Sequence, residues 1–269
     1  MSHPAKSPIS TKVPDTAATR EIMVRLCDLW DSSLDGEAIY RPELDAPRAV
    51  SIRTQTHHAV RVCRAILQIE PTLRGIEIVP LARLVFECAI TSTWLLLTPG
   101  AGNALIRDGA GQRLKALRSA AMAQDGSAAA IAESERVLKE LEDAGGPGSY
   151  AFEQRCLALD GGESLYLTYR ALSAESHAGL GLADFYSVKD NRSAIGVSFN
   201  PLAQSSVYEA TFGITACMLL LAINADELGR DKPHRTTQIA RAAKRLGVEP
   251  RIVGKGGYEL PPRGSDRGN

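Results

Sequence analysis

The sequence predicts an all-α protein, a helical bundle of about eight helices with a small hairpin or loop flap near residues 186–199. Three observations lead to this fold class. Apolar residues recur every three to four positions along most of the chain. Clusters of proline and glycine divide it into segments of helix length, and only one segment alternates with a two-residue period. A chain of 269 residues is long enough to bury a sizeable core.

The first half of the chain predicts a tail followed by five helices. Residues 1–15 contain three prolines among small polar residues, so we expect a disordered tail. Thr16 or Thr19 is the expected cap of the first helix. The third helix is apolar on nearly every side and is therefore expected at the centre. The five predicted helices cover residues 16–33, 49–69, 79–97, 101–124 and 127–143.

The second half begins after the Gly-Gly-Pro-Gly linker at residues 145–148. A short helix at 149–159 precedes a helical stretch at 163–186. Alternation around a polar turn then predicts the hairpin. A long apolar helix at 204–228 and a last helix at 234–246 follow. We expect one helical domain over residues 16–246 and an irregular C-terminal tail over residues 247–269.

Composition limits the class of protein and its partners. The net charge is zero, which argues against a protein that coats nucleic acid. Residues 230–255 nevertheless carry eight Lys or Arg against two acids, either a solvated face or a contact for RNA. The five cysteines are scattered, so we expect buried reduced thiols, with no disulfide framework and no metal site. Without a signal pattern or a run of about 20 apolar residues, the sequence predicts a cytoplasmic protein with no membrane segment.

Four polar side chains in the stretch 163–186 make up the candidate site. Tyr166, Arg170, Ser173 and His177 follow one another at offsets of four, three and four, which places them on one face of a helix. A histidine can transfer protons near neutral pH, and an arginine can hold a phosphate with two hydrogen bonds. This pair therefore suits the cleavage of a phosphodiester, although satisfied structural residues would give the same pattern.

An Arg-Glu pair in the third predicted helix accompanies these residues. Arg83 and Glu87 are four apart in an otherwise apolar helix, so they form either an internal ion pair or part of a site. Glu87 would orient His177 if the third helix and the stretch 163–186 were neighbours, and we expect that they are.

Two short blocks carry a family resemblance. Arg83 and Glu87, followed by Tyr169-Arg170-Ala171-Leu172-Ser173 and His177, resemble the "R-x-x-x-E … Y-x-x-L-S-x-x-x-H" pattern of a bacterial all-helical family of unknown function. The spacing from Arg170 to His177 is also similar to the R-x4-6-H motif of HEPN proteins, which are helical and often cleave RNA. Arg53 and His58 match that motif as well.

Two hypotheses follow from these residues and resemblances. The HEPN similarity implies a metal-independent endoribonuclease of a bacterial toxin or phage-defence system, without a cofactor and acting as a homodimer. His177 would be the acid or base and Arg170 the phosphate clamp, supported by Tyr166, Ser173, Glu87 and Arg83. The alternative is a non-enzymatic ligand-binding or scaffold protein in which the same side chains form a structural network.

Overall fold

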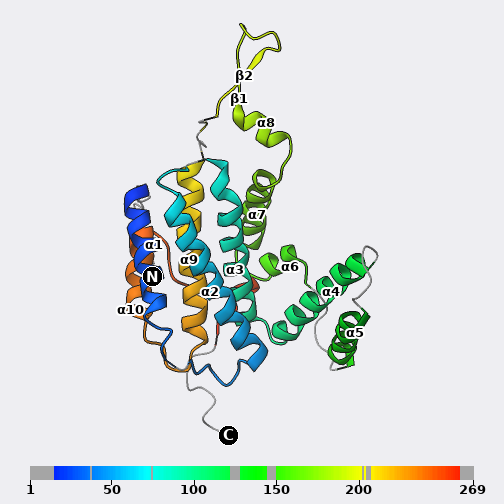
Figure 1. Ribbon diagram of the computed structural model, residues 1–269. Coiled ribbons are helices and arrows are strands. Elements are labelled where there is room, and N and C mark those ends of the chain that lie inside the picture. Colours follow the sequence, from blue (N-terminus) through cyan, green and yellow to red (C-terminus); the bar gives the residue numbers. More distant parts are fainter. Residues whose placement is uncertain are drawn as a thin grey trace.

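The chain folds into a bundle of α-helices with one two-stranded antiparallel sheet (Figure 1), which confirms the predicted all-α class. The computed structural model describes residues 15–36, 38–73, 75–121, 128–143, 150–201, 203 and 207–260. Most of the predicted tail 1–15 and the predicted linker at 145–148 lie outside these residues.

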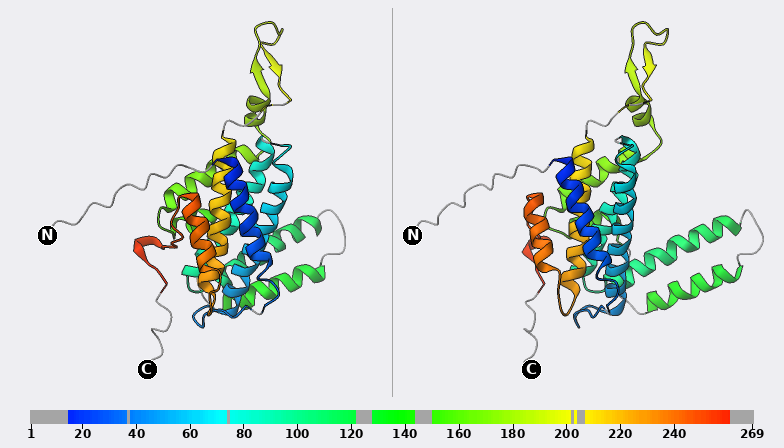
Figure 2. Two further views of the ribbon diagram at one scale, coloured as in Figure 1. Left: turned by 90° about the vertical axis from the view of Figure 1, so that its left-hand side faces the viewer. Right: turned by 60° about the vertical axis from the view of Figure 1, so that its left-hand side comes forward.

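Two apolar helices form the centre of the bundle. Helix α3 (Val79–Leu97) packs against α9 (Tyr208–Gly229), and α2 (Ala46–Ile69) lies against both. Helices α1 (Thr16–Asp31) and α10 (Thr236–Leu246) cover α9 from the outside (Figures 1 and 2). Helices α3 and α9 carry apolar residues on nearly all sides because they are surrounded by other helices.

These central helices are also long and apolar enough to cross a membrane, judged by length and composition alone. The two stretches are Ile76–Leu97, which includes the short 3₁₀ helix η1 (Ile76–Ile78), and Tyr208–Gly229. Their most apolar windows are 72% and 67% buried inside the bundle. Packing among helices therefore accounts for their composition. The absence of a membrane segment stays a prediction.

Side chains at helix ends tie the bundle together. The Asp15 carboxylate accepts a hydrogen bond from the Ala18 N–H at 2.8 Å, so Asp15 caps α1 and the expectation of a threonine cap is wrong. At the start of α2 the buried Arg48 donates hydrogen bonds to the carbonyls of Leu95 and Leu96, both at 2.7 Å. Those carbonyls belong to the last turn of α3, where a cation is favourable.

The stretch predicted as one helix over 163–186 is broken. Helix α7 (Gly162–Ser176) packs against α3 and is preceded by the short α6 (Phe152–Leu157). The chain then turns at residues 177–179 before α8 (Leu180–Tyr186). The glycines at positions 179 and 181 weaken helical continuity there, which gives a local reason for the break.

Two arms extend from the bundle. Helices α4 (Ala101–Ala121) and α5 (Ala128–Asp143) lie side by side and project from its side (Figure 2). Strands β1 (Ser187–Lys189) and β2 (Val197–Phe199) form a hairpin beyond α8, with Val188 opposite Ser198. The hairpin predicted near residues 186–199 is therefore confirmed.

The segment that follows α10 is irregular but attached. Apart from the 3₁₀ helix η2 (Lys255–Gly257), residues 247–260 form no helix. The Asp160 N–H donates to the Val253 carbonyl at 2.9 Å, and the Lys255 N–H donates to the Ala158 carbonyl at 2.9 Å. This segment therefore packs on the turn between α6 and α7 and belongs to the folded domain, which continues past the predicted end at residue 246.

Candidate functional site

Helix α7 presents one face to α3, and this face carries only part of the predicted set. Leu172 is buried there, while Tyr166, Tyr169 and Ser173 are half-buried. Leu172, Tyr166 and Tyr169 pack against the apolar cluster built around α3. The Ser173 hydroxyl is buried and has no hydrogen-bond partner among the described residues. The side of α7 that packs against α3 is therefore formed mainly by aromatic and apolar side chains, and not by the polar set that the sequence predicts.

Arg170 and His177 lie away from this face. Both side chains are exposed, and the Arg170 guanidinium sits 6.0 Å from the centre of the Tyr166 ring. His177 follows the last residue of α7 in an extended conformation, with φ −95° and ψ 141°. The expectation that four side chains share one helical face is therefore wrong for His177, because the helix ends before it.

Arg83 and Glu87 form a network with Tyr169. The Arg83 Nε donates to Glu87 at 3.0 Å, and its terminal nitrogen donates to the Tyr169 hydroxyl at 3.3 Å. The guanidinium also lies 5.3 Å from the centre of the Tyr169 ring. Burial lowers the pKa of Arg83, but the Glu87 charge and both hydrogen bonds raise it more, so the net pKa is above its ordinary value.

The network around Arg83 tests the expectation that α3 and the α7 stretch are adjacent and that Glu87 orients His177. Helices α3 and α7 are adjacent, as predicted. Within the described part of the chain, however, Glu87 is hydrogen-bonded to Arg83, and no hydrogen bond joins it to His177. The residue of α7 that contacts the Arg83–Glu87 pair is Tyr169, one residue before the predicted site residue Arg170. A change of one residue turns the helix by about 100°, which is why the sequence pattern selected the wrong neighbour.

Glu87 also lines an open cleft between α2, α3 and α6. The cleft has a volume of about 440 Å³, within the range of small-molecule sites. Its polar and apolar lining residues come from all three helices: Gln55, His58, Leu84, Glu87, Cys88, Thr91, Phe152 and Arg155. His58 belongs to the second match to the HEPN spacing, whose Arg53 instead lies 5.9 Å from the centre of the Trp30 ring.

Arg155 is the best-fixed cation in this cleft. One terminal nitrogen donates to Asp108 at 2.7 Å, and the other approaches the Thr91 hydroxyl at 3.5 Å. The guanidinium lies 5.2 Å from the centre of the buried Trp94 ring. Its Nε is buried and has no partner among the described residues. An arginine held this firmly at the wall of a cleft presents a fixed positive charge to an acceptor group.

A second charged network lies fully inside the bundle, at the C-terminal end of α9. The Arg235 guanidinium donates to Asp226 at 2.5 Å and to Glu227 at 2.9 Å, and Arg230 donates to Asp226 at 2.9 Å. The Tyr40 hydroxyl also donates to Asp226. Asp226 and Glu227 are at most 1% exposed. These bonds hold α10 and the loop before α2 against α9, so the network is structural.

Ion pairs in this network and outside it change the interpretation of the basic run at residues 230–255. Arg230 and Arg235 are buried ion-pair partners, and Arg245 pairs with Glu21 at 2.6 Å. Arg251 pairs with Glu259. Much of the positive charge expected for a solvated face or an RNA contact is therefore neutralised within the fold.

Cysteine and metal chemistry receive little support from the described residues. Burial raises the pKa of Cys27, Cys88 and Cys156, each to about 12, so these thiols stay protonated at neutral pH. All five cysteines are free, and four of them are buried. In the part of the chain that the structure describes, no cluster of three His, Cys, Asp or Glu is arranged to hold a metal ion.

Comparison with known proteins leaves the family resemblance as an expectation. No protein-family model, curated protein or solved structure matches the chain.

Proposed function

We propose that this protein is a non-enzymatic helical binding protein whose site is the cleft between α2, α3 and α6. The observation that carries the proposal is Arg155, which lines this cleft and is fixed there by Asp108 and Trp94. In this proposal the Arg83–Glu87–Tyr169 network is structural and shapes one wall of the cleft.

The lining defines the chemistry of the ligand. Arg155 favours an acidic group, because its planar guanidinium pairs with carboxylates and phosphates. Gln55 and Thr91 offer neutral hydrogen-bonding groups, while Leu84 and Phe152 offer an apolar wall. We therefore infer a small ligand with an acidic group and an apolar or aromatic body.

A thermal-shift experiment tests this proposal. Wild type is melted with a panel of aromatic carboxylates and nucleoside monophosphates, and any stabilising compound is titrated against Gln55→Ala and His58→Ala. A bound ligand raises the melting temperature by mass action. We expect at least one panel member to stabilise wild type and to bind the two variants several-fold more weakly. Absence of any shift, or equal binding to wild type and both variants, would overturn the proposal.

The HEPN-like ribonuclease is the second candidate, and one observation favours it. Arg170 and His177 are both exposed, and neither makes an ion pair among the described residues, so both are accessible to an RNA backbone. In this alternative the enzyme is a metal-independent endoribonuclease of a toxin or phage-defence system. The resemblance implies that two copies bring two such motifs together. In one chain, His177 lies beyond the end of helix α7, which carries Arg170.

Incubation with total bacterial RNA without metal separates the two candidates. The ribonuclease predicts cleavage by wild type and loss of cleavage in His177→Ala and Arg170→Ala, with unchanged melting curves. Arg192→Ala is the matched control, because Arg192 is 94% exposed and lies in the turn between β1 and β2, outside α7. If no RNA is cut by wild type, or if His177→Ala cuts as well as wild type, the ribonuclease is excluded.

A further inference from the structure

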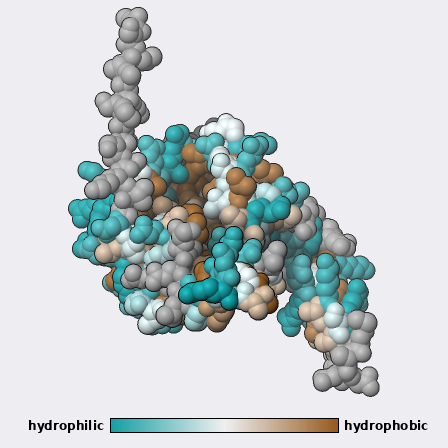
Figure 3. Space-filling model, turned by 90° about the horizontal axis from the view of Figure 1, so that it is seen from above, coloured by the Kyte–Doolittle hydropathy of each residue, from teal (hydrophilic) through white to brown (hydrophobic). Residues whose placement is uncertain are grey.

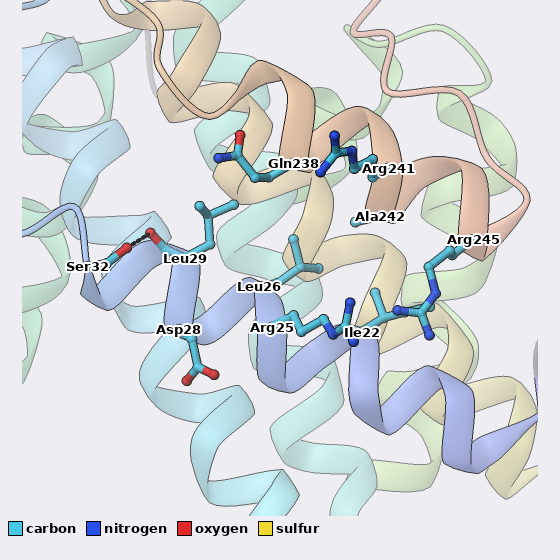
Figure 4. A pocket seen from close by; sticks show the side chains of 10 residues that line it. All are labelled: Ile22, Arg25, Leu26, Asp28, Leu29, Ser32, Gln238, Arg241, Ala242 and Arg245. Carbon is cyan, nitrogen blue, oxygen red and sulfur yellow. Dashed lines mark hydrogen bonds between the residues drawn. The ribbon is translucent and has the colours of Figure 1, made fainter.

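A groove between α1 and α10 shares no lining residue with the α2/α3/α6 cleft and has a different chemistry (Figure 4). Its volume is about 480 Å³. Ile22 and Leu26 of α1 form its floor, and Leu29 and Ala242 form half-buried walls. The groove therefore offers a continuous apolar surface of the size that small ligands occupy.

Positive charge gathers at one end of this groove. Three arginines line the groove. Arg25 and Arg245 lie on either side of Ile22 at this end, and Arg241 lies farther along α10, between Arg245 and Gln238 (Figure 4). Glu21 accepts hydrogen bonds from Arg25 at 2.5 Å and from Arg245 at 2.6 Å, so two of these three guanidinium groups share one carboxylate. Arg241 has no ion pair among the described residues.

The other end of the groove lacks this excess of cations. It is lined by Leu29, Ser32 and Gln238 (Figure 4). Asp28 also lines the groove, but its carboxylate is already bound by Arg64 at 2.6 Å. The groove is thus apolar along its length and cationic at one end, which matches a molecule with an anionic head and an apolar tail.

The size of the groove favours a small molecule as its occupant. Its volume of about 480 Å³ lies within the range of small-molecule sites, and its apolar floor residues Ile22 and Leu26 are buried. From these observations we propose that the groove binds an aliphatic carboxylate, with its head at Arg241 and its tail over Leu26 and Leu29. This site is independent of the proposed α2/α3/α6 cleft.

Isothermal titration of the full chain with decanoate, below its micelle-forming concentration, tests this site. Acetate supplies the head alone and decanol the tail alone, so we expect both to bind much more weakly than decanoate. Arg241→Gln removes the cation without breaking an ion pair seen in the structure, and we expect about tenfold weaker binding. Ala242→Leu fills the groove and is expected to abolish binding.

Arg192→Gln is the matched control, because it removes an exposed arginine of the β1–β2 turn that does not line the groove, so it should leave binding unchanged. Melting curves check that each variant is folded. If wild type does not bind decanoate, the site is refuted. The same conclusion follows if decanol binds as tightly as decanoate, or if folded Arg241→Gln and Ala242→Leu both bind like wild type. A folding defect in one variant leaves the other variant and the ligand comparison to decide.

Discussion

Arg235 links the two buried carboxylates of the charge network described above. It is 1% exposed, it bonds to Asp226, Glu227 and the Ser33 hydroxyl, and it lies 5.2 Å from the centre of the Trp30 ring. Removing one partner of a buried ion pair leaves the other charge in a medium that solvates it poorly. The stability of the whole bundle therefore depends on this residue.

We expect Arg235→Ala to lower the free energy of unfolding by about 3–5 kcal/mol. Urea denaturation followed by circular dichroism measures the change. Arg192→Ala is the control and should change stability by less than about 0.5 kcal/mol, because its side chain is 94% exposed. Equal stability of the two variants would show that the network contributes little.

The same network gives the protein a characteristic response to acid. Burial raises the pKa of Asp226, but Arg235, the Tyr40 hydroxyl and Arg230 together lower it below its ordinary value. A carboxyl group whose pKa is lower in the folded state takes up protons first in the unfolded chain. Its stabilisation is therefore complete above the ordinary pKa of about 4 and is lost as pH falls through the lower folded value.

Wild type should consequently lose stability between about pH 5 and pH 2, and Asp226→Asn should lose less over the same interval. Urea unfolding at several pH values measures both slopes. The comparison uses the slope because the substitution itself lowers stability at every pH. Parallel slopes for the two proteins would contradict the assigned role of Asp226.

At the scale of elements, two glycines in α4 differ in the space that a side chain would find at their positions. A Cβ at Gly102 would lie 2.7 Å from the backbone nitrogen of Arg48 and 2.7 Å from the Cβ of Pro47, so α4 crosses the start of α2 too closely for a side chain. A Cβ at Gly109 would meet nothing within 4 Å. One glycine is therefore needed for packing, and the other only weakens the helix.

We expect Gly102→Ala to destabilise the protein by about 1–3 kcal/mol, because the backbone of α2 must move. Gly109→Ala should instead stabilise it by roughly 0.5–1 kcal/mol, since alanine favours a helix. Thermal unfolding of both variants measures the difference, and each is the control for the other. A stabilising Gly102→Ala would show that α4 moves freely relative to α2.

The elements also show what a sequence can predict. Apolar periodicity placed the central helices correctly, because α3 and α9 are buried on nearly all sides. Alternation placed the hairpin. The break after Ser176 was missed because the polar residues on both sides fit one helical repeat, although the glycines that follow are a local signal.

The candidate site was less predictable because it depends on contacts between helices. Nothing in the local sequence links His58, Glu87 and Arg155, which come together only when α2, α3 and α6 pack. The adjacency of α3 and α7 was predicted, but the partner of Arg83 on α7 was not. A helical pattern predicts which residues lie on a given face to within about one position. A hydrogen bond, in contrast, requires the correct residue at that position.

At the scale of the whole molecule, the hairpin is the least integrated part of the described chain. Ile195, in the turn before β2, and Phe199 are 80% and 72% exposed, and Val197, which is 40% exposed, lies on the same face of β2 as Phe199. We call these three residues the apolar strip. Two isolated strands are marginally stable in water. The surface at the hairpin end shows hydrophobic side chains among hydrophilic ones (Figure 3). The bundle core, by contrast, lies beneath the hairpin and does not include these residues.

This separation leads to a prediction for the double variant Ile195→Ser/Phe199→Ser. Its melting temperature should match that of wild type, because substitutions of exposed side chains change stability little. If the expected homodimer uses this apolar strip, the double variant should be monomeric at concentrations where wild type is dimeric. Light scattering coupled to size-exclusion chromatography measures the mass, and Arg192→Ser on the same hairpin is the control. A dimer of unchanged affinity in the double variant would exclude the strip as the dimer contact, while a lowered melting temperature would show that the strip stabilises the folded chain.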